Sequence, residues 1–331
     1  MSELTLRAGL AFLLAVVATS ALIPPLRALG LRRGLVDGPG GRKTQARPVP
    51  YLGGVAIVAA VIATLSTVQT FEARLAGVAA AAVLLGVVGL LDDRHPLGVD
   101  VRLAAQVAAA AVVTAGGVQV LVTDIPAVDV VLTIIWLVAI TNALNLLDNM
   151  DGVAGSVALL SSLGIAALAI DDGQRVIAVG AAGLAGACAG FLVFNARRAS
   201  IYLGDSGALF VGFVLAVLSV EVNSALANPG SFLIPIGLLG IAILDSTLVT
   251  VLRLRRGVSP FTAGRDHLAH RLLARGYSPG RALVGLSGAH AVMVALAVLA
   301  GVDLLVLGAA VLGWAVVAGG VLVSVRPARS A

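Results

Sequence analysis

The sequence predicts an all-α integral membrane protein that crosses the bilayer about eleven times. Of its 331 residues, 59% are hydrophobic and only 12% are charged, and the mean hydropathy is +1.05. Apolar stretches of roughly 20 residues, the length that a helix needs to cross a bilayer, recur from one end to the other. They leave no room for a soluble domain, so we expect residues 1–331 to form a single transmembrane domain.

The candidate spans are apolar segments separated by polar loops. They lie at about 5–26, 51–69, 75–91, 103–122, 128–147, 153–170, 176–194, 207–224, 231–250, 282–301 and 304–324. Pro24 and Pro25 stand near the end of the first segment and predict that its helix ends there. This segment is long enough to span, which disfavours a cleavable signal peptide. A single cysteine, Cys188, excludes an intramolecular disulfide and a thiolate metal cage.

The basic residues predict the orientation. Of the 22 lysines and arginines, 19 fall in alternate loops and in the tail, at 27–50, 92–102, 195–206, 251–281 and from 325 onward. Because basic loops stay in the cytoplasm, this distribution places the N-terminus outside, the C-terminus inside and the active face on the cytoplasmic side of the plasma membrane. It also argues against nucleic-acid binding, since the arginines follow the topology of the chain.

Acidic residues gather on the same face, which the positive-inside rule does not require. Asp92 and Asp93 end the third apolar segment. Two adjacent aspartates at a helix C-terminus repel each other and the helix dipole, which favours a role with a divalent cation or a proton. The alternative is a helix end that simply meets water.

A polar stripe ends the fifth segment. Asn142, Asn145, Asp148 and Asp151 repeat every three residues, so on a helix they would share one side. Amides can bind a base or a sugar, and carboxylates can bind a metal or hold hydroxyl groups. A polar helix end capped by Gly152 is the alternative.

Asp205 lies in a polar turn before the eighth segment. It could be the N-cap of the helix that begins near Gly207. The same helix N-terminus would attract phosphate, and Arg197 and Arg198 are close in the sequence. Both interpretations can hold together.

The longest cytoplasmic loop, 251–281, carries His267 and His270 among several arginines, including Arg265 and Arg271. An anion site is favoured over zinc here, since neighbouring cations raise the cost of binding another cation. The alternative is a basic surface against anionic lipid headgroups.

Acids and arginines that meet at one membrane face suggest a divalent metal that holds a polyphosphate. Aspartates would bind Mg²⁺ through oxygen, and arginines would hold phosphate oxygens. We therefore predict phosphoryl transfer from a water-soluble donor to a membrane-soluble acceptor.

Taken together, these segments resemble the polyprenyl-phosphate N-acetylhexosamine-1-phosphate transferases, the bacterial glycosyltransferase 4 superfamily that includes the phospho-MurNAc-pentapeptide translocase. The matching segments are GLVDGPGGRKTQARPVPYLGG at 34–54, LLDDR at 90–94, NALNLLDNMDGVAG at 142–155, IYLGDSGALFVG at 201–212 and the segment 244–278. They follow the order of the family and span about 245 residues.

The resemblance implies transfer of a sugar 1-phosphate from a UDP-sugar to a polyprenyl phosphate, with release of UMP. Mg²⁺ is the implied cofactor, and Mn²⁺ could replace it. The implied partners are the two substrates and membrane lipids, while a homodimer stays open. The pathway would start a cell-envelope glycan, such as lipopolysaccharide, teichoic acid or the arabinogalactan linker.

The resemblance also assigns roles to residues. The implied catalytic residues are Asp92 as general base, Asp93, Asp148 and Asp151. Asp205 would be the main metal ligand, assisted by Asp148. The implied substrate-binding residues are Lys43, Asn142, Asn145, Arg265, His267, His270 and Arg271.

Two positions depart from the family pattern. Gln45 stands where many relatives have histidine, and Ala269 replaces one imidazole of the usual HxHH motif. The histidine-rich loop that accompanies a pentapeptide donor is not recognisable. We therefore predict the GlcNAc-1-phosphate branch.

A secondary transporter is the main alternative function. Its acids would lie near the middle of the spans to relay protons or ions. Most acids here lie at one face, and Asp245, a turn or two inside its segment, is the best exception.

Overall fold

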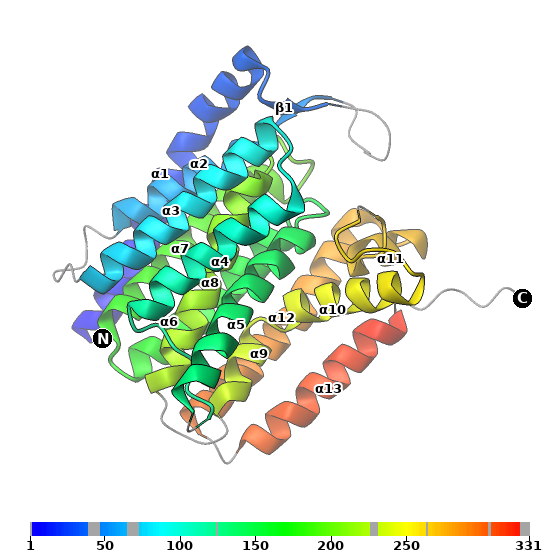
Figure 1. Ribbon diagram of the computed structural model, residues 1–331. Helices are drawn as coiled ribbons and strands as arrows, with labels where there is room; N and C mark the ends of the chain where they lie inside the picture. The colour runs from blue at the N-terminus through cyan, green and yellow to red at the C-terminus, as the bar shows by residue number, and fades with distance from the viewer. Residues whose placement is uncertain are drawn as a thin grey trace, which may run out of the picture.

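The computed structural model describes residues 2–38, 47–64, 73–123, 125–225, 231–262, 264–303 and 306–324. These residues form a helical bundle with one short antiparallel strand pair, and α13 lies at its edge beside α10 and α12 (Figure 1). The elements are α1 Glu3–Arg33, β1 Val36–Asp37, β2 Val49–Pro50, α2 Gly53–Thr64, α3 Ala73–Arg94, α4 Val99–Ala115, α5 Pro126–Leu147, α6 Val153–Asp171, α7 Arg175–Asn195, α8 Gly204–Ala225, a 3₁₀ turn Ser231–Leu233, α9 Ile234–Leu238, α10 Gly240–Arg255, α11 Leu268–Ala274, α12 Pro279–Val302 and α13 Leu307–Ser324.

Seven of the described helices are long and apolar enough to cross a membrane: α1, α3, α5, α6, α7, α8 and α12. Within the same ranges, α2 and α13 are shorter apolar helices. The α4 helix ends at Ala115, before two glycines, and is shorter than the span predicted at 103–122. These helices confirm an all-α, multi-pass membrane protein.

The first helix continues past its prolines. α1 runs through Pro24 and Pro25 to Arg33, so the predicted helix end at the prolines is wrong. Membrane helices tolerate proline because neighbouring helices support the interrupted backbone, and Ile23 beside the prolines is fully buried in the bundle. The helix ends at Gly34, whose φ of 69° is the left-handed conformation that favours glycine.

The predicted single span at 231–250 is also interrupted. α9 ends at Leu238, and α10 begins at Gly240. The carbonyl of Leu238 accepts a hydrogen bond from Ser161 Oγ at 2.7 Å, and this hydroxyl also pairs with His290 Nε2 at 2.9 Å. A side chain of α6, itself held by one of α12, thus satisfies the backbone carbonyl at the break, and the chain can change direction inside the bundle.

α3 and α8 are antiparallel neighbours that are tied together at both ends. At one end, the Asp93 carboxylate accepts hydrogen bonds from the backbone N–H groups of Asp205 at 3.0 Å and Ser206 at 3.3 Å. At the other end, Arg74 forms an ion pair with Glu221. The register of these two helices is therefore fixed twice.

The start of α8 is held equally closely by α2. A Cβ atom on Gly54 would lie 2.1 Å from the backbone nitrogen of Gly207, so this approach requires glycine. The N–H groups of Gly53 and Gly54 donate to the carbonyls of Tyr202 at 2.9 Å and Leu203 at 2.8 Å. The turn that leads into α8 is thus positioned by the backbone of α2.

We expect Gly54→Ala to destabilise the protein, because the added methyl group has no space beside α8. Overpacking of this kind costs about 1–3 kcal/mol. Cys188 is 1% exposed, so its reaction with a thiol-specific dye during heating reports unfolding. The melting temperature of Gly54→Ala should fall.

The matched control is Gly77→Ala on α3, where a Cβ atom would meet nothing within 4 Å. Its melting temperature should not fall. Equal melting temperatures for the two variants would contradict the close approach of α2 and α8.

Candidate active site

Asp92 organises the end of α3 and the turn into α4. Its carboxylate accepts hydrogen bonds from the backbone N–H of Leu97 at 2.6 Å and from Arg102 Nη1 at 2.8 Å, and its side chain is buried. Arg102 comes from the first turn of α4. The alternative of a helix end that simply meets water is therefore wrong.

Asp93 serves a different helix. Its two oxygens accept the first N–H groups of α8, so Asp93 caps α8 from a neighbouring helix. The N-terminus of a helix carries partial positive charge, which stabilises a carboxylate there. Arg102 at Asp92 and the N-terminus of α8 at Asp93 thus each stabilise one of the two adjacent carboxylates.

Asp205 lies in the first turn of α8 with its side chain directed toward α4 and α5. Its Oδ1 accepts a hydrogen bond from Asn145 Nδ2 at 2.8 Å, and its Oδ2 lies 4.0 Å from Arg102 Nη1. Because Asp93 makes the capping bonds, the interpretation of Asp205 as the N-cap of α8 is wrong. Asp205 is instead the point where side chains from three helices meet.

Only the first half of the predicted polar stripe is helical. Asn142 and Asn145 lie on α5, but this helix ends before Asp148, which is its C-cap residue. Asp151 follows in a turn, so the predicted helical alignment of all four side chains is wrong. The chain leaves the helical conformation at Asp148, whose ψ is 55°, and Gly152, with a φ of 80° and an N–H that donates to Asn195 Oδ1 at 2.8 Å, begins the next helix.

Asp148 nevertheless belongs to the acidic cluster. Burial raises the pKa of its carboxyl group to about 7, with further contributions from the negative charges of Asp205, Asp93 and Asp151. Besides burial, these three neighbouring carboxylates place negative charge close to Asp148. The surroundings of Asp148 therefore favour a cation.

Two predicted residues are already engaged in internal contacts. Asp151 Oδ2 accepts a hydrogen bond from the backbone N–H of Ala199 at 2.9 Å, which ties two loops together. Asn142 Nδ2 donates to Gln106 Oε1 and to the carbonyl of Val138. The Asn142 oxygen also accepts a hydrogen bond from Gln106 Nε2 at 3.5 Å, so the two amides pair through both of their ends.

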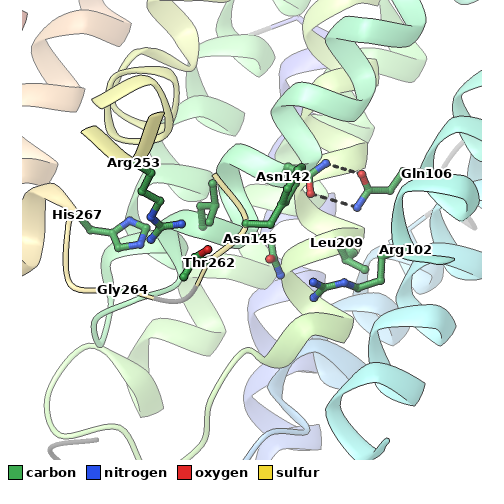
Figure 2. Close-up of a pocket in the computed structure, with 11 residues that line it drawn as sticks. Arg102, Gln106, Asn142, Asn145, Leu209, Arg253, Thr262, Gly264 and His267 are labelled. Carbon is green, nitrogen blue, oxygen red and sulfur yellow. Dashed lines mark hydrogen bonds between the residues drawn. The ribbon is translucent and has the colours of Figure 1, made fainter. Parts of the chain in front are cut away.

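A cavity of about 330 Å³ lies beside these groups (Figure 2). It is lined by Arg102, Gln106, Asn142, Asn145, Leu146, Leu209, Arg253, Phe261, Thr262, Gly264 and His267. Guanidinium, amide and imidazole groups thus share the cavity with apolar side chains. This mixture suits a ligand that has both an anionic and an apolar part.

Of the eleven lining residues, the sequence predicted Asn142, Asn145 and His267 as site residues, and the arginine and glutamine side chains among the other eight are Arg102, Gln106 and Arg253. Gln106 and Arg253 are each 2% exposed. Arg253 donates to the carbonyl of Pro260 and pairs with Asp266. Buried polar residues in membrane helices are costly without partners, and the isolated glutamine in the apolar run of α4 is a signal that could have marked this site.

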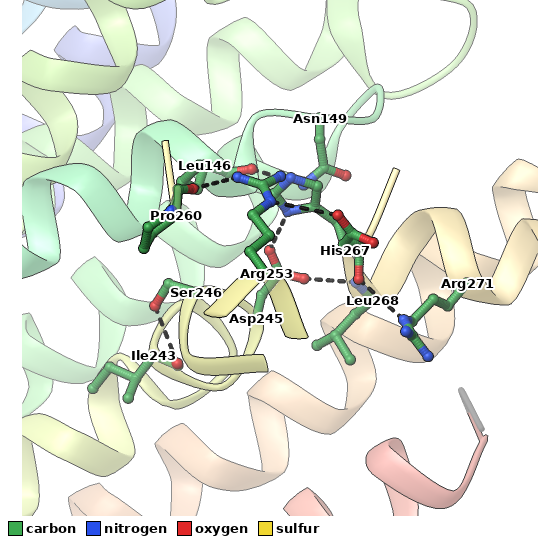
Figure 3. A network of polar contacts seen from close by, with 11 residues as sticks. Leu146, Asn149, Ile243, Asp245, Ser246, Arg253, Pro260, His267, Leu268 and Arg271 are labelled. Atoms are coloured by element: carbon green, nitrogen blue, oxygen red, sulfur yellow. Dashed lines mark hydrogen bonds and ion pairs between the residues drawn. The ribbon is translucent and has the colours of Figure 1, made fainter. Parts of the chain in front are cut away.

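His267 lines the cavity. It is the N-cap residue of α11, and its Nδ1 donates to Asp245 Oδ2 at 2.7 Å (Figure 3). The ring of His270 lies edge-on to that of His267, with 5.7 Å between the centroids, but it is not part of the cavity lining. Burial, followed by the charges of His267 and Arg265, lowers the pKa of His270. Ala269 is buried in the core, which leaves little room for a third imidazole.

The other predicted cations lie farther from the cavity. Arg271 Nε donates to the carbonyl of Asp266 at 3.1 Å, and neither Arg271 nor Arg265 is among the lining residues. Lys43 and Gln45 lie outside the described residues.

Among the described residues, no three acidic, histidine or cysteine side chains form a preformed metal site. Asp205, Asp148 and the free oxygen of Asn145 still offer a set of oxygen donors in a region of excess negative charge. Mg²⁺ typically binds one or two carboxylates and takes its other ligands from water and substrate phosphates. These residues therefore fit Mg²⁺.

Comparison with known proteins identifies the family. A model of glycosyl transferase family 4 matches residues 75–223. The decaprenyl-phosphate N-acetylglucosaminephosphotransferase of Mycobacterium tuberculosis is 32% identical over 315 residues, which cover 82% of this chain and 77% of that protein. The undecaprenyl-phosphate alpha-N-acetylglucosaminyl 1-phosphate transferase of Escherichia coli is 27% identical over 288 residues, which cover 83% of this chain and 78% of that protein. A Bacillus subtilis protein, named a probable undecaprenyl-phosphate N-acetylglucosaminyl 1-phosphate transferase, is 28% identical over 288 residues. The match covers 84% of this chain and 80% of that protein. The chain therefore belongs to glycosyl transferase family 4.

Proposed function

We propose that this protein transfers GlcNAc 1-phosphate from UDP-GlcNAc to a polyprenyl phosphate, releasing UMP and starting a cell-envelope glycan. The observation that supports this most is the cavity beside Asp205, where arginine, amide and apolar side chains meet. The names of the Mycobacterium tuberculosis and Escherichia coli relatives support the same lipid class and the same sugar.

The acceptor side of the proposed reaction centres on Arg102. An oxygen of the lipid phosphate attacks the phosphorus that carries the sugar, and the bond from this phosphorus to the bridging oxygen of UMP breaks. Arg102 lies between Asp92 and Asp205, so its guanidinium can hold a lipid phosphate oxygen near both. Asp92 is the proposed general base for the remaining proton of that phosphate.

The donor side combines acids with cations. Asp205 and Asp148, with Asn145, are the proposed holders of Mg²⁺ or Mn²⁺, which when bound would neutralise charge on the donor diphosphate. Arg253 and His267 lie across the cavity from Arg102 and are the proposed contacts of the diphosphate (Figure 2). The further proposed substrate contacts are Lys43, Asn142, Arg265, His270 and Arg271.

The transporter alternative loses its best support. Asp245 is fully buried and accepts hydrogen bonds from the His267 ring and from the backbone N–H of Leu268. An acid that relays ions needs access to them. The pairing of Asp245 leaves no such role for it.

The proposed function is tested by UMP release. Purified protein should release UMP when incubated with polyprenyl phosphate, Mg²⁺ and UDP-GlcNAc, and less with UDP-GalNAc or UDP-glucose. If none of the UDP-sugars tested gives UMP, the proposed function is refuted.

We expect Asp205→Asn to lower kcat/KM by roughly 100-fold or more, because the variant lacks the charge of the proposed main metal ligand. Part of the loss should be recovered as the Mg²⁺ concentration is raised. Glu221→Gln, at the opposite end of the same helix, is the matched control and should keep normal turnover. If Asp205→Asn has normal turnover at limiting Mg²⁺, Asp205 is not a metal ligand.

We further propose eleven spans in the plasma membrane, with the N-terminus outside and the catalytic loops in the cytoplasm, on the strength of the basic-residue distribution. A reporter fused after Ala331 should be cytoplasmic, and one inserted near Gly173 should be external. A C-terminal reporter on the outer side would rule out this topology.

A further inference from the structure

Asp245 is a buried carboxylate that the proposed reaction leaves without a role. It lies on α10, is 0% exposed and faces the start of α11 (Figure 3). Its Oδ1 accepts a hydrogen bond from the backbone N–H of Leu268 at 2.6 Å, and its Oδ2 accepts one from His267 Nδ1 at 2.7 Å. One carboxylate therefore holds both the first turn of α11 and the ring of its N-cap residue.

The bond to Asp245 decides which edge of the His267 ring is available to a ligand. An ionised carboxylate can only accept, so Nδ1 carries the proton of this bond. Nε2 is at the opposite edge of the ring, and the ring lines the cavity together with Arg253 and Gly264.

We propose that Asp245 is a positioning residue for the transferase reaction. It orients His267 and supplies the negative charge that allows the ring to donate a hydrogen bond from Nε2 to an oxygen of the donor diphosphate. This donation becomes stronger as negative charge develops on the departing UMP. The inference rests on the proposed function, and no bond forms or breaks at Asp245.

A purely structural role would be to cap α11. The two roles use different oxygens of the carboxylate, one bound to the Leu268 N–H and the other to the His267 ring. Only the positioning role disappears when the ring is removed. The two roles can therefore be separated by experiment.

The test is a double-mutant cycle of wild type, Asp245→Asn, His267→Ala and the double variant, measured as UMP release at fixed Mg²⁺. Asparagine keeps an oxygen that can accept the Leu268 N–H but carries no negative charge. Asp245→Asn alone should lower kcat/KM by roughly 10- to 100-fold, the range for residues that orient an active group. In the His267→Ala background, the same change should alter kcat/KM by less than about 2-fold.

Two buried residues away from the cavity are the matched controls. His290 pairs with Ser161, and Asp129 accepts a hydrogen bond from the backbone N–H of Thr123 at 3.0 Å. His290→Ala and Asp129→Asn should lower the melting temperature while kcat/KM stays within about 2-fold of wild type. Equal losses of kcat/KM from Asp245→Asn in both backgrounds, or normal kcat/KM for Asp245→Asn, would overturn the inference.

A second measurement needs no Asp245 variant. The chain has four histidines, so ¹⁵N-histidine labelling gives few ring signals, and His267→Ala assigns the one of interest. With UDP-GlcNAc bound, a ring with protons on both Nδ1 and Nε2 supports the inference, and a ring protonated on only one of the two nitrogens overturns it. Absence of UMP release by wild type would instead refute the proposed function, while the ring signal would still test the bond to Asp245.

Discussion

The carboxylate of Asp93 joins the end of one membrane helix to the start of another, and the site depends on this joint. Because both of its oxygens accept backbone N–H groups of α8, Asp205 is fixed relative to α3. Asn145 and Arg102 then approach Asp205 from α5 and α4. A buried polar group is stable only when it is bonded, so helix capping and assembly of the site are here the same interaction.

The site has one region of acidic side chains and one region of arginine side chains. Asp205 and Asp148 lie in one group of carboxylates with Asp93 and Asp151, and the charges of these neighbours add to the effect of burial in raising the pKa of Asp148. Arg102 and Arg253 place guanidinium groups in the cavity. A cation and an anionic diphosphate that bind together would satisfy both regions at once, whereas either alone would leave one region uncompensated. The geometry therefore favours mutually dependent binding of metal and donor.

The helices and the acidic motifs were predictable because each is visible as a pattern within a short stretch of the sequence. A membrane span requires a long apolar run whatever its neighbours, and Asp205 was marked by the turn in which it lies. Contacts between segments that are far apart in the sequence produce no such local pattern. The capping of α8 by Asp93 joins residues 112 positions apart, and the break at Leu238 depends on a hydroxyl of α6. The pairing of Asp245 with His267 was missed for the same reason.

The double tie between α3 and α8 sets a length as well as a register. On α8, the bond to Asp93 at Asp205 and the ion pair at Glu221 are separated by 16 residues. At 1.5 Å per residue this is roughly 24 Å, not far from the hydrocarbon thickness of about 30 Å. One inserted residue between the two ties would rotate one end of α8 by about 100° and break one of them. The two contacts therefore fix the number of residues between them, and we expect length changes in these two helices to be far less acceptable than in the loops that connect them.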